Sequence, residues 1–257
     1  HHAQGAISRQ DPSGARLLKK KMHAVKSMGK RFEREKENFE EIPLRADAIL
    51  VKFSNTKSLP TNKTILHLED KSVKLGDKVL AHSLNLLVKS PQKIGIIGQN
   101  GVGKSTLLKQ LWTELSQRTD IAAGYMPQNY AEYLLMGETP VEFLSKTGDS
   151  EERTQVMTYL GSMRFTTDEM HHPIQSLSGG QQAKLLLLKI DLSGQNVLLL
   201  DEPTRNFSPL SQPELRKLFK NFGGSIITIS HDRMFLKEVC DQVYELKKDG
   251  LVRVEME

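Results

Sequence analysis

Residues 93–112, KIGIIGQNGVGKSTLLKQLW, decide the fold. The first six form a short apolar run typical of a buried strand, and KSTLLKQLW has the apolar spacing of a helix. Between them, Gly98, Gly103, Lys104 and Ser105 form the pattern GxxxxGKS. The glycines let successive backbone N–H groups curl round a phosphate, the lysine reaches the β- and γ-phosphates, and the serine hydroxyl binds Mg²⁺. This stretch predicts a strand–loop–helix unit that binds a nucleoside triphosphate with Mg²⁺.

The composition limits the class of protein. The chain has 257 residues, of which 38% are apolar and 26% charged, enough for one good core and a smaller appendage. Its apolar runs are strand-sized, so we expect a soluble protein with no transmembrane segment of its own. The single cysteine, Cys240, excludes an internal disulfide framework and favours a reducing compartment. We therefore expect a cytoplasmic location.

The remaining apolar runs predict the other strands that surround the quoted stretch. VLLLD (197–201) and SIITI (225–229) are strand-like and alternate with helical segments, which predicts a parallel sheet with helices on its faces. Residues 65–88 alternate around the turn signal Gly76-Asp77 and predict an antiparallel β subdomain. A small helical subdomain is expected over about 135–176. The fold class is thus α/β, with a P-loop NTPase core over residues 61–257.

The first part of the chain differs in character. Residues 15–39 lack proline, carry a basic excess up to Arg34, and place apolar residues at heptad-like intervals from Leu18 onward. We expect residues 1–60 to form a charged helical arm and a connector. A basic helix of this kind can contact RNA phosphates, whereas the alternative is a solvated coiled-coil face.

Three polar residues follow predicted strands at the edge where parallel sheets collect ligands. Asp201 ends VLLLD and suits a metal ion, whereas the adjacent Glu202 points to the opposite side and suits polarising an attacking water. His231 follows SIITIS in the same way, so a polar contact with the γ-phosphate is expected.

With these pieces in order, residues 65–257 resemble the ATP-binding cassette (ABC) ATPases. GQNGVGKST (98–106) resembles the Walker A motif, Gln128 the Q-loop, LSGGQ (177–181) the signature, VLLLDEP (197–203) Walker B with its catalytic glutamate, and SHD (230–232) the switch histidine. The resemblance implies Mg-ATP binding and hydrolysis. Its catalytic residues are Glu202, His231 and Gln128, and its metal site is Ser105, Gln128 and Asp201. Its nucleotide-binding residues are Gly98, Asn100, Gly101, Gly103, Lys104, Ser105, Thr106, Ser178, Gly179, Gly180 and Gln181.

The resemblance also implies a partner. In this family two cassettes pair head to tail, and each signature closes over the ATP held by the Walker A loop of the other. Ser178 and the N–H groups of Gly179 and Gly180 begin a helix, which suits an anionic phosphate. One loop and one signature make half of this sandwich, so a second cassette is expected from a longer chain or a second copy.

Local features resemble the ABC-F group, whose members carry two cassettes and act on ribosomes as translation or antibiotic-resistance factors. These features are GGQQAKLLLLK (179–189), DEPTRN (201–206), SHDRMFLKEVCD (230–241) and the short segment between Gln128 and Leu177. Residues 15–39 resemble the return helix between two cassettes, which implies contact with ribosomal RNA or tRNA. The alternatives are the ATP-binding subunit of a membrane ABC transporter and a clamp that does not hydrolyse nucleotide.

Two positions depart from the family pattern. Ser208 stands where the family has an aspartate at the dimer interface, and Lys74 and Leu75 stand where an aromatic side chain commonly stacks on adenine. These departures bear on communication between the two sites and on selectivity for the base.

Overall fold

The computed structural model of the protein describes residues 49, 51–53 and 55–256. The helix expected over residues 15–39 lies outside these residues. A six-stranded sheet organises the described part, in the order β4-β5-β6-β3-β7-β8. Its strands are β4 (Ala123–Met126), β5 (Val197–Asp201), β6 (Ser225–Ile229), β3 (Lys93–Ile97), β7 (Gln242–Lys247) and β8 (Gly250–Val254). All neighbouring pairs are parallel except β7 and β8.

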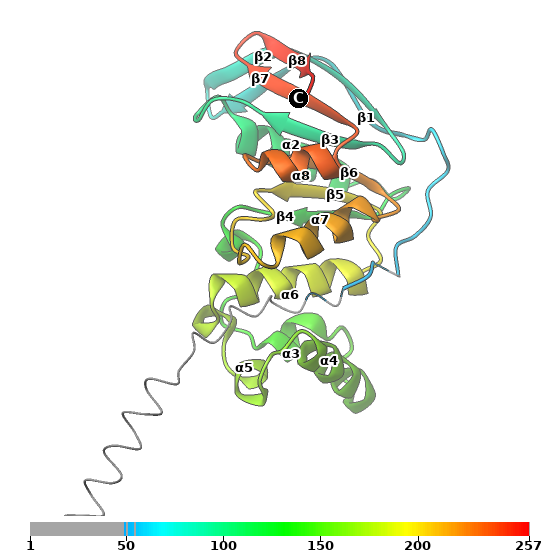
Figure 1. Ribbon diagram of the computed structural model, residues 1–257, viewed down its shortest axis with the longest axis vertical. Coiled ribbons are helices and arrows are strands. Elements are labelled where there is room, and N and C mark those ends of the chain that lie inside the picture. Colours follow the sequence, from blue (N-terminus) through cyan, green and yellow to red (C-terminus); the bar gives the residue numbers. More distant parts are fainter. Residues whose placement is uncertain (1–48, 50, 54, 257) are drawn as a thin grey trace, which may run out of the picture. The chain divides into compact units, whose positions relative to one another are not determined.

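An antiparallel hairpin precedes this sheet. Strands β1 (Thr64–Leu75) and β2 (Lys78–Lys89) pair from Thr64 opposite Lys89 to Leu75 opposite Lys78, around the predicted turn at Gly76-Asp77. Within the described residues, the hairpin lies on the same side as β7 and β8 (Figure 1). The predicted combination of a parallel sheet with an antiparallel β subdomain is confirmed.

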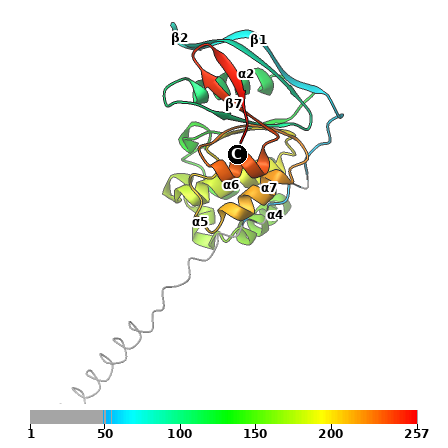
Figure 2. The same ribbon diagram turned by 45° about the horizontal axis from the view of Figure 1, so that its top comes forward.

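The helices divide between the two faces of the sheet. They are α2 (Lys104–Ser116), α3 (Pro140–Leu144), α4 (Ser150–Ser162), α5 (Thr167–His171), α6 (Gly179–Leu192), α7 (Gln212–Lys220) and α8 (Arg233–Val239), with short 3₁₀ turns η1 (Tyr130–Glu132) and η2 (Ile174–Ser176). In two views, α4 and α5 lie beyond α6, on the side away from the hairpin (Figures 1 and 2). Among the described residues, every helix is too short or too polar to cross a bilayer.

Alternation along β5 explains the two hydrophobic cores. Val197 and Leu199 pack with α2 and the hairpin, whereas Leu198 and Leu200 pack with α3–α8. Every residue of β5 is buried, as expected for a strand covered on both faces. By the same alternation Asp201 falls on the α2 side, so β5 carries its carboxylate toward the helix that follows the glycine loop.

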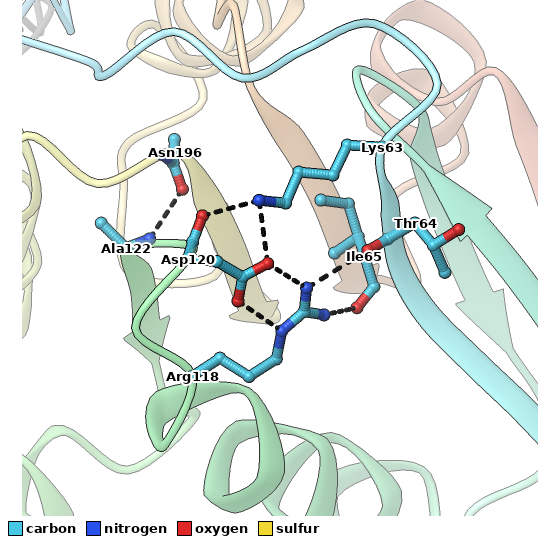
Figure 3. A network of polar contacts seen from close by, with 7 residues as sticks. All are labelled: Lys63, Thr64, Ile65, Arg118, Asp120, Ala122 and Asn196. Carbon is cyan, nitrogen blue, oxygen red and sulfur yellow. Dashed lines mark hydrogen bonds and ion pairs between the residues drawn. The ribbon is translucent and has the colours of Figure 1, made fainter.

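A polar network ties the hairpin to the sheet (Figure 3). Arg118 donates to both carboxylate oxygens of Asp120, at 2.9 and 2.7 Å, and to the Ile65 carbonyl at 2.6 Å. Lys63 donates to the Asp120 carboxylate at 2.8 Å. Since Asp120 lies between α2 and β4, these contacts fix the first residues of β1 against the connection that follows α2.

Candidate functional site

The loop between β3 and α2 has the backbone that its glycines permit. Gly98 has φ +149° and Gly103 has φ +106°. A Cβ at Gly98 would lie 2.6 Å from the carbonyl oxygen of Leu246 in β7, and one at Gly103 would lie 3.1 Å from Leu80 of the hairpin. Glycine is therefore required here both by conformation and by close approach.

Lys104 is the first residue of α2, and its side chain turns back into the loop. Its Nζ donates to the carbonyl oxygens of Gly98 at 2.7 Å and Gln99 at 3.0 Å. Burial lowers the pKa of Lys104, and the nearby carboxylates of Glu202 and Asp201 act in the opposite direction. The ammonium group thus lies inside the curve where the loop N–H groups would hold phosphate oxygens.

Asp201 is buried at the carboxyl end of β5 and forms a hydrogen bond with Ser105. Burial raises the pKa of the Asp201 carboxyl, although the bond from Ser105 and the charge of Lys104 oppose the rise. A desolvated carboxylate beside a hydroxyl supplies the oxygen ligands that Mg²⁺ prefers. These residues therefore fit the ion that the sequence pattern implies.

Glu202 adopts a left-handed backbone, with φ +52°. This conformation is uncommon for a residue with a side chain, and such strain gathers at functional sites. The turn brings the carboxylate to the end of β6, where its Oε2 accepts from the His231 backbone N–H at 3.2 Å. His231 Nε2 lies 3.5 Å from the other oxygen, Oε1. Burial raises the pKa of the Glu202 carboxyl despite these contacts.

Of the residues that the sequence predicts around the loop, all but Gly98 line one cavity of about 750 Å³. Gln128, just after β4, lies on its wall with Asp201, Glu202 and His231. The full lining is Leu75, Lys78, Leu80, Asn100, Gly101, Gly103, Lys104, Ser105, Thr106, Gln128, Asp201, Glu202, Arg205, Ile229 and His231. Sequence reasoning missed four of these lining residues, Lys78, Leu80, Arg205 and Ile229. Lys78 and Leu80 come just after the predicted hairpin turn, and this turn is the sequence feature that could have pointed to them.

The signature residues do not line this cavity. Ser178 is the N-cap of α6, and its hydroxyl accepts from the Gln181 backbone N–H at 3.3 Å. Gly179 and Gly180 form the first turn, where a Cβ on Gly180 would meet the Asn206 carbonyl oxygen at 3.1 Å. The structure therefore separates two groups that sequence analysis assigned to nucleotide binding.

Ser208 lies in the loop that follows Glu202, and its hydroxyl is 2.8 Å from that of Ser211. The two serines share a hydrogen bond beside the start of α7. Leu75 lies on the cavity wall and is 64% exposed. The first departure is therefore an uncharged hydroxyl, and the second places an exposed aliphatic side chain on the cavity wall next to the charged Lys74.

Comparison with known proteins gives one family. A profile described as ABC transporter matches residues 81–205. The "Probable ATP-binding protein YheS" of Escherichia coli strain K12 is 33% identical over 199 residues, which cover 75% of this chain and 31% of that protein. "ABC transporter F family member 2" of Arabidopsis thaliana is 33% identical over 184 residues, 68% of this chain and 27% of that protein.

A third relative extends further along the chain. The "Ribosome protection protein VmlR" of Bacillus subtilis is 28% identical over 261 residues, which cover 97% of this chain and 46% of that protein. The chain thus spans less than half the length of these curated relatives. Among solved structures, the dimeric cassette MJ0796 bound to ADP and Pi has the same fold, with a TM-score of 0.61 at 19% identity over 74% of this chain and 98% of that one. The chain therefore belongs to the ABC ATPases, and its cassette is of the ABC-F type.

Proposed function

We propose that this cassette binds Mg-ATP and hydrolyses it in a head-to-tail pair with a second cassette. The observation that supports pairing is the separation of the two phosphate-binding segments. Lys104 lines the cavity, whereas Ser178 and its glycines begin α6 outside that lining. Because a helix N-terminus favours an anion, the signature of one cassette can complete the site of another.

The residues around the cavity would have separate roles in binding and hydrolysing ATP. The loop N–H groups from Asn100 to Thr106 and the Lys104 ammonium would bind the phosphates. Ser105, Gln128 and Asp201 would hold Mg²⁺, which supplies positive charge against the phosphate oxygens. The Glu202 carboxylate would polarise the attacking water as a general base, and His231 would contact the γ-phosphate.

We further propose that the chain is the second cassette, with part of the preceding linker, of an ABC-F protein that acts on the ribosome. The similarity to VmlR covers 97% of the chain, so it includes most of the basic segment before the cassette. A basic segment of this kind suits RNA phosphates.

Co-sedimentation with purified ribosomes tests this role. Glu202→Gln should bind ATP without hydrolysing it, so the variant should pellet with ribosomes when ATP is present at low salt. Binding should weaken steeply as salt rises, because phosphate contacts release counterions. The control is Glu202→Gln combined with Lys104→Ala, which cannot hold the nucleotide. The ribosomal role would be contradicted if the two variants pelleted equally, or if Glu202→Gln did not pellet with ribosomes at all.

The alternative is the ATP-binding subunit of a membrane transporter, which the profile's description as ABC transporter favours. It predicts that Glu202→Gln stays in the supernatant with ribosomes and binds membranes that carry a transporter partner.

A further inference from the structure

Two capping boxes meet at the start of α6. In the first, Ser178 caps α6, and the Gln181 side-chain oxygen Oε1 accepts from the Ser178 backbone N–H at 2.9 Å and from its hydroxyl at 3.0 Å. In the second, Thr166 caps α5, and Glu169 Oε2 accepts from the Thr166 backbone N–H at 2.8 Å. Each box satisfies the backbone donors of its own helix.

A single contact joins the two boxes. The side-chain amide nitrogen of Gln181 donates to Glu169 Oε1. Each polar atom of the Gln181 side chain is therefore committed, with the nitrogen facing Glu169 and the oxygen facing Ser178. A carboxylate oxygen accepts and does not donate. Glu169 thus excludes the flipped amide, which would turn an N–H group toward the Ser178 hydroxyl.

The surroundings of Glu169 keep its carboxylate ionised. Burial opposes the charge, but the hydrogen bonds from Thr166 and Gln181 outweigh it, and the positive charge of Lys184 one turn along α6 adds to them. The pKa of Glu169 consequently lies below its ordinary value. At neutral pH this group is an acceptor only.

We propose that Glu169 is a positioning residue for the signature: by orienting the Gln181 amide, it fixes the Ser178 cap at the start of α6, the group that would meet the γ-phosphate bound by the opposite cassette. In the unpaired chain this hydroxyl donates to Gln181, so it must turn from Gln181 to the phosphate when two cassettes close. Because Glu169 holds the amide, Gln181 Oε1 can still accept from the Ser178 backbone N–H after the hydroxyl has turned, so the start of α6 keeps its shape. The inference rests on the proposed shared site, and it makes α5 the element through which the helical segment can alter pairing.

The test measures ATP-driven pairing of the 257-residue chain by sedimentation velocity, with Glu202→Gln present to prevent hydrolysis. Glu169→Ala should weaken pairing roughly tenfold, the effect of losing one charge-assisted hydrogen bond. Binding of a fluorescent ATP analogue to the unpaired chain should not change, because Glu169 does not line the cavity. Glu169→Gln keeps the shape of the side chain but can donate as well as accept, so it admits the flipped Gln181 amide and should lose nearly as much pairing as Glu169→Ala.

The chain contains a matched control. Thr139 and Glu142 form the same capping box at the start of α3, where Glu142 accepts from the Thr139 backbone and hydroxyl. Glu142→Ala therefore removes an equivalent cap and should leave pairing unchanged. If it weakens pairing as much as Glu169→Ala, the effect is general loss of helix capping and the inference is wrong.

A double-mutant cycle tests whether Glu169 acts through Gln181. Glu169→Ala should add little in a chain that already carries Gln181→Ala, whereas additive losses would overturn the inference. If the Glu169→Ala chain pairs as well as its parent, the role of Glu169 is wrong, whereas the proposed shared site is unaffected. A Glu202→Gln chain that does not pair with ATP at all would overturn the shared site, and this inference with it.

Discussion

At the residue scale, the position that suits Glu202 for catalysis also lowers the stability of the fold. Its carboxylate is buried at the cavity wall, and burial raises its pKa in the folded chain. Ionised Glu202 therefore destabilises the fold at pH values above that raised pKa. The penalty is absent below the unfolded pKa, grows as pH rises from the unfolded to the folded pKa, and is complete above the folded one. Retention of this group is consistent with a role in chemistry rather than in folding.

Glu202→Gln should consequently raise thermal stability in the absence of nucleotide. The amide oxygen can still accept from the His231 N–H, and the buried charge is gone. We expect a higher melting temperature at pH 8, by about 2–4 °C for each kcal/mol recovered in a chain of this size. The gain should shrink as the pH falls from 8 to 4.5, the ordinary pKa of a glutamate, because Glu202 in the parent chain takes up a proton as the pH passes its raised pKa.

Thermal unfolding at the two pH values measures this effect. Glu255→Gln is the matched control, because Glu255 is exposed beyond β8. It removes the same charge and should shift the melting temperature little at either pH. A Glu202→Gln chain that is less stable than its parent at pH 8 would contradict the explanation.

Cys240 offers a second test at this scale. Burial at the end of α8 raises the pKa of its thiol to about 12, from an ordinary 9.0. Because the thiolate is the reactive form, modification by a disulfide reagent at pH 8 should be roughly a thousandfold slower than for an unperturbed thiol. Cys240 is the only cysteine of the chain, so the absorbance change reports it directly. Rapid reaction of the folded chain, at the rate seen in urea, would contradict this.

At the element scale, the Arg118 network holds β1 to the connection between α2 and β4. Lysine cannot reproduce the paired contact of a guanidinium with both Asp120 oxygens while also reaching the Ile65 carbonyl. The side chain of Asp120 is 46% exposed, and exposed pairs contribute little. We therefore expect Arg118→Lys to lower the melting temperature by only about 1–3 °C.

Calorimetry checks this value against Arg253→Lys, a change of the same kind on the exposed face of β8. The control should leave the transition where it is. A fall of the same size in both variants would show that the network in Figure 3 adds nothing specific.

The elements that sequence analysis predicted are those with strong local signals. GxxxxGKS requires left-handed glycines and a following helix, and VLLLD and SIITI are apolar enough to be strands buried on both faces. Strand β4 is only four residues, AGYM, and includes a glycine, so its pattern is too short to recognise. Strand β7 mixes charged and apolar residues, and its place in the sheet depends on pairing with β3, far away in the sequence.

The candidate site shows the same division. Asp201, Glu202 and His231 could be predicted because each lies at or just after the end of a recognisable strand. The contact between Glu169 and Gln181 could not, because it depends on how α5 packs against the start of α6. Ser208 could be recognised as a departure from the family pattern, but its bond to Ser211 depends on the local turn.

At the scale of the whole molecule, the separation of Lys104 from Ser178 underlies our proposal that activity requires two cassettes. In a head-to-tail pair of identical chains, each ATP contacts the Lys104 loop of one chain and the signature of the other. Lys104→Ala and Ser178→Arg should each abolish most hydrolysis, the first by removing the phosphate contact and the second by filling the start of α6 with a bulky side chain. Turnover of the parent chain should rise with protein concentration.

Mixing the two inactive variants tests this directly. Half of the pairs formed at random from an equal mixture contain one chain of each kind, and each mixed pair has one intact site, built from Lys104 of the Ser178→Arg chain and Ser178 of the Lys104→Ala chain. Phosphate release should therefore recover to about a quarter of the parent rate at the same total concentration. A mixture of Lys104→Ala with a chain carrying both substitutions has no intact site and should stay inactive. If the true mixture also stays inactive while both variants fold and the parent hydrolyses ATP, or if Ser178→Arg alone retains full turnover, then each nucleotide is enclosed within one chain and the paired arrangement is wrong.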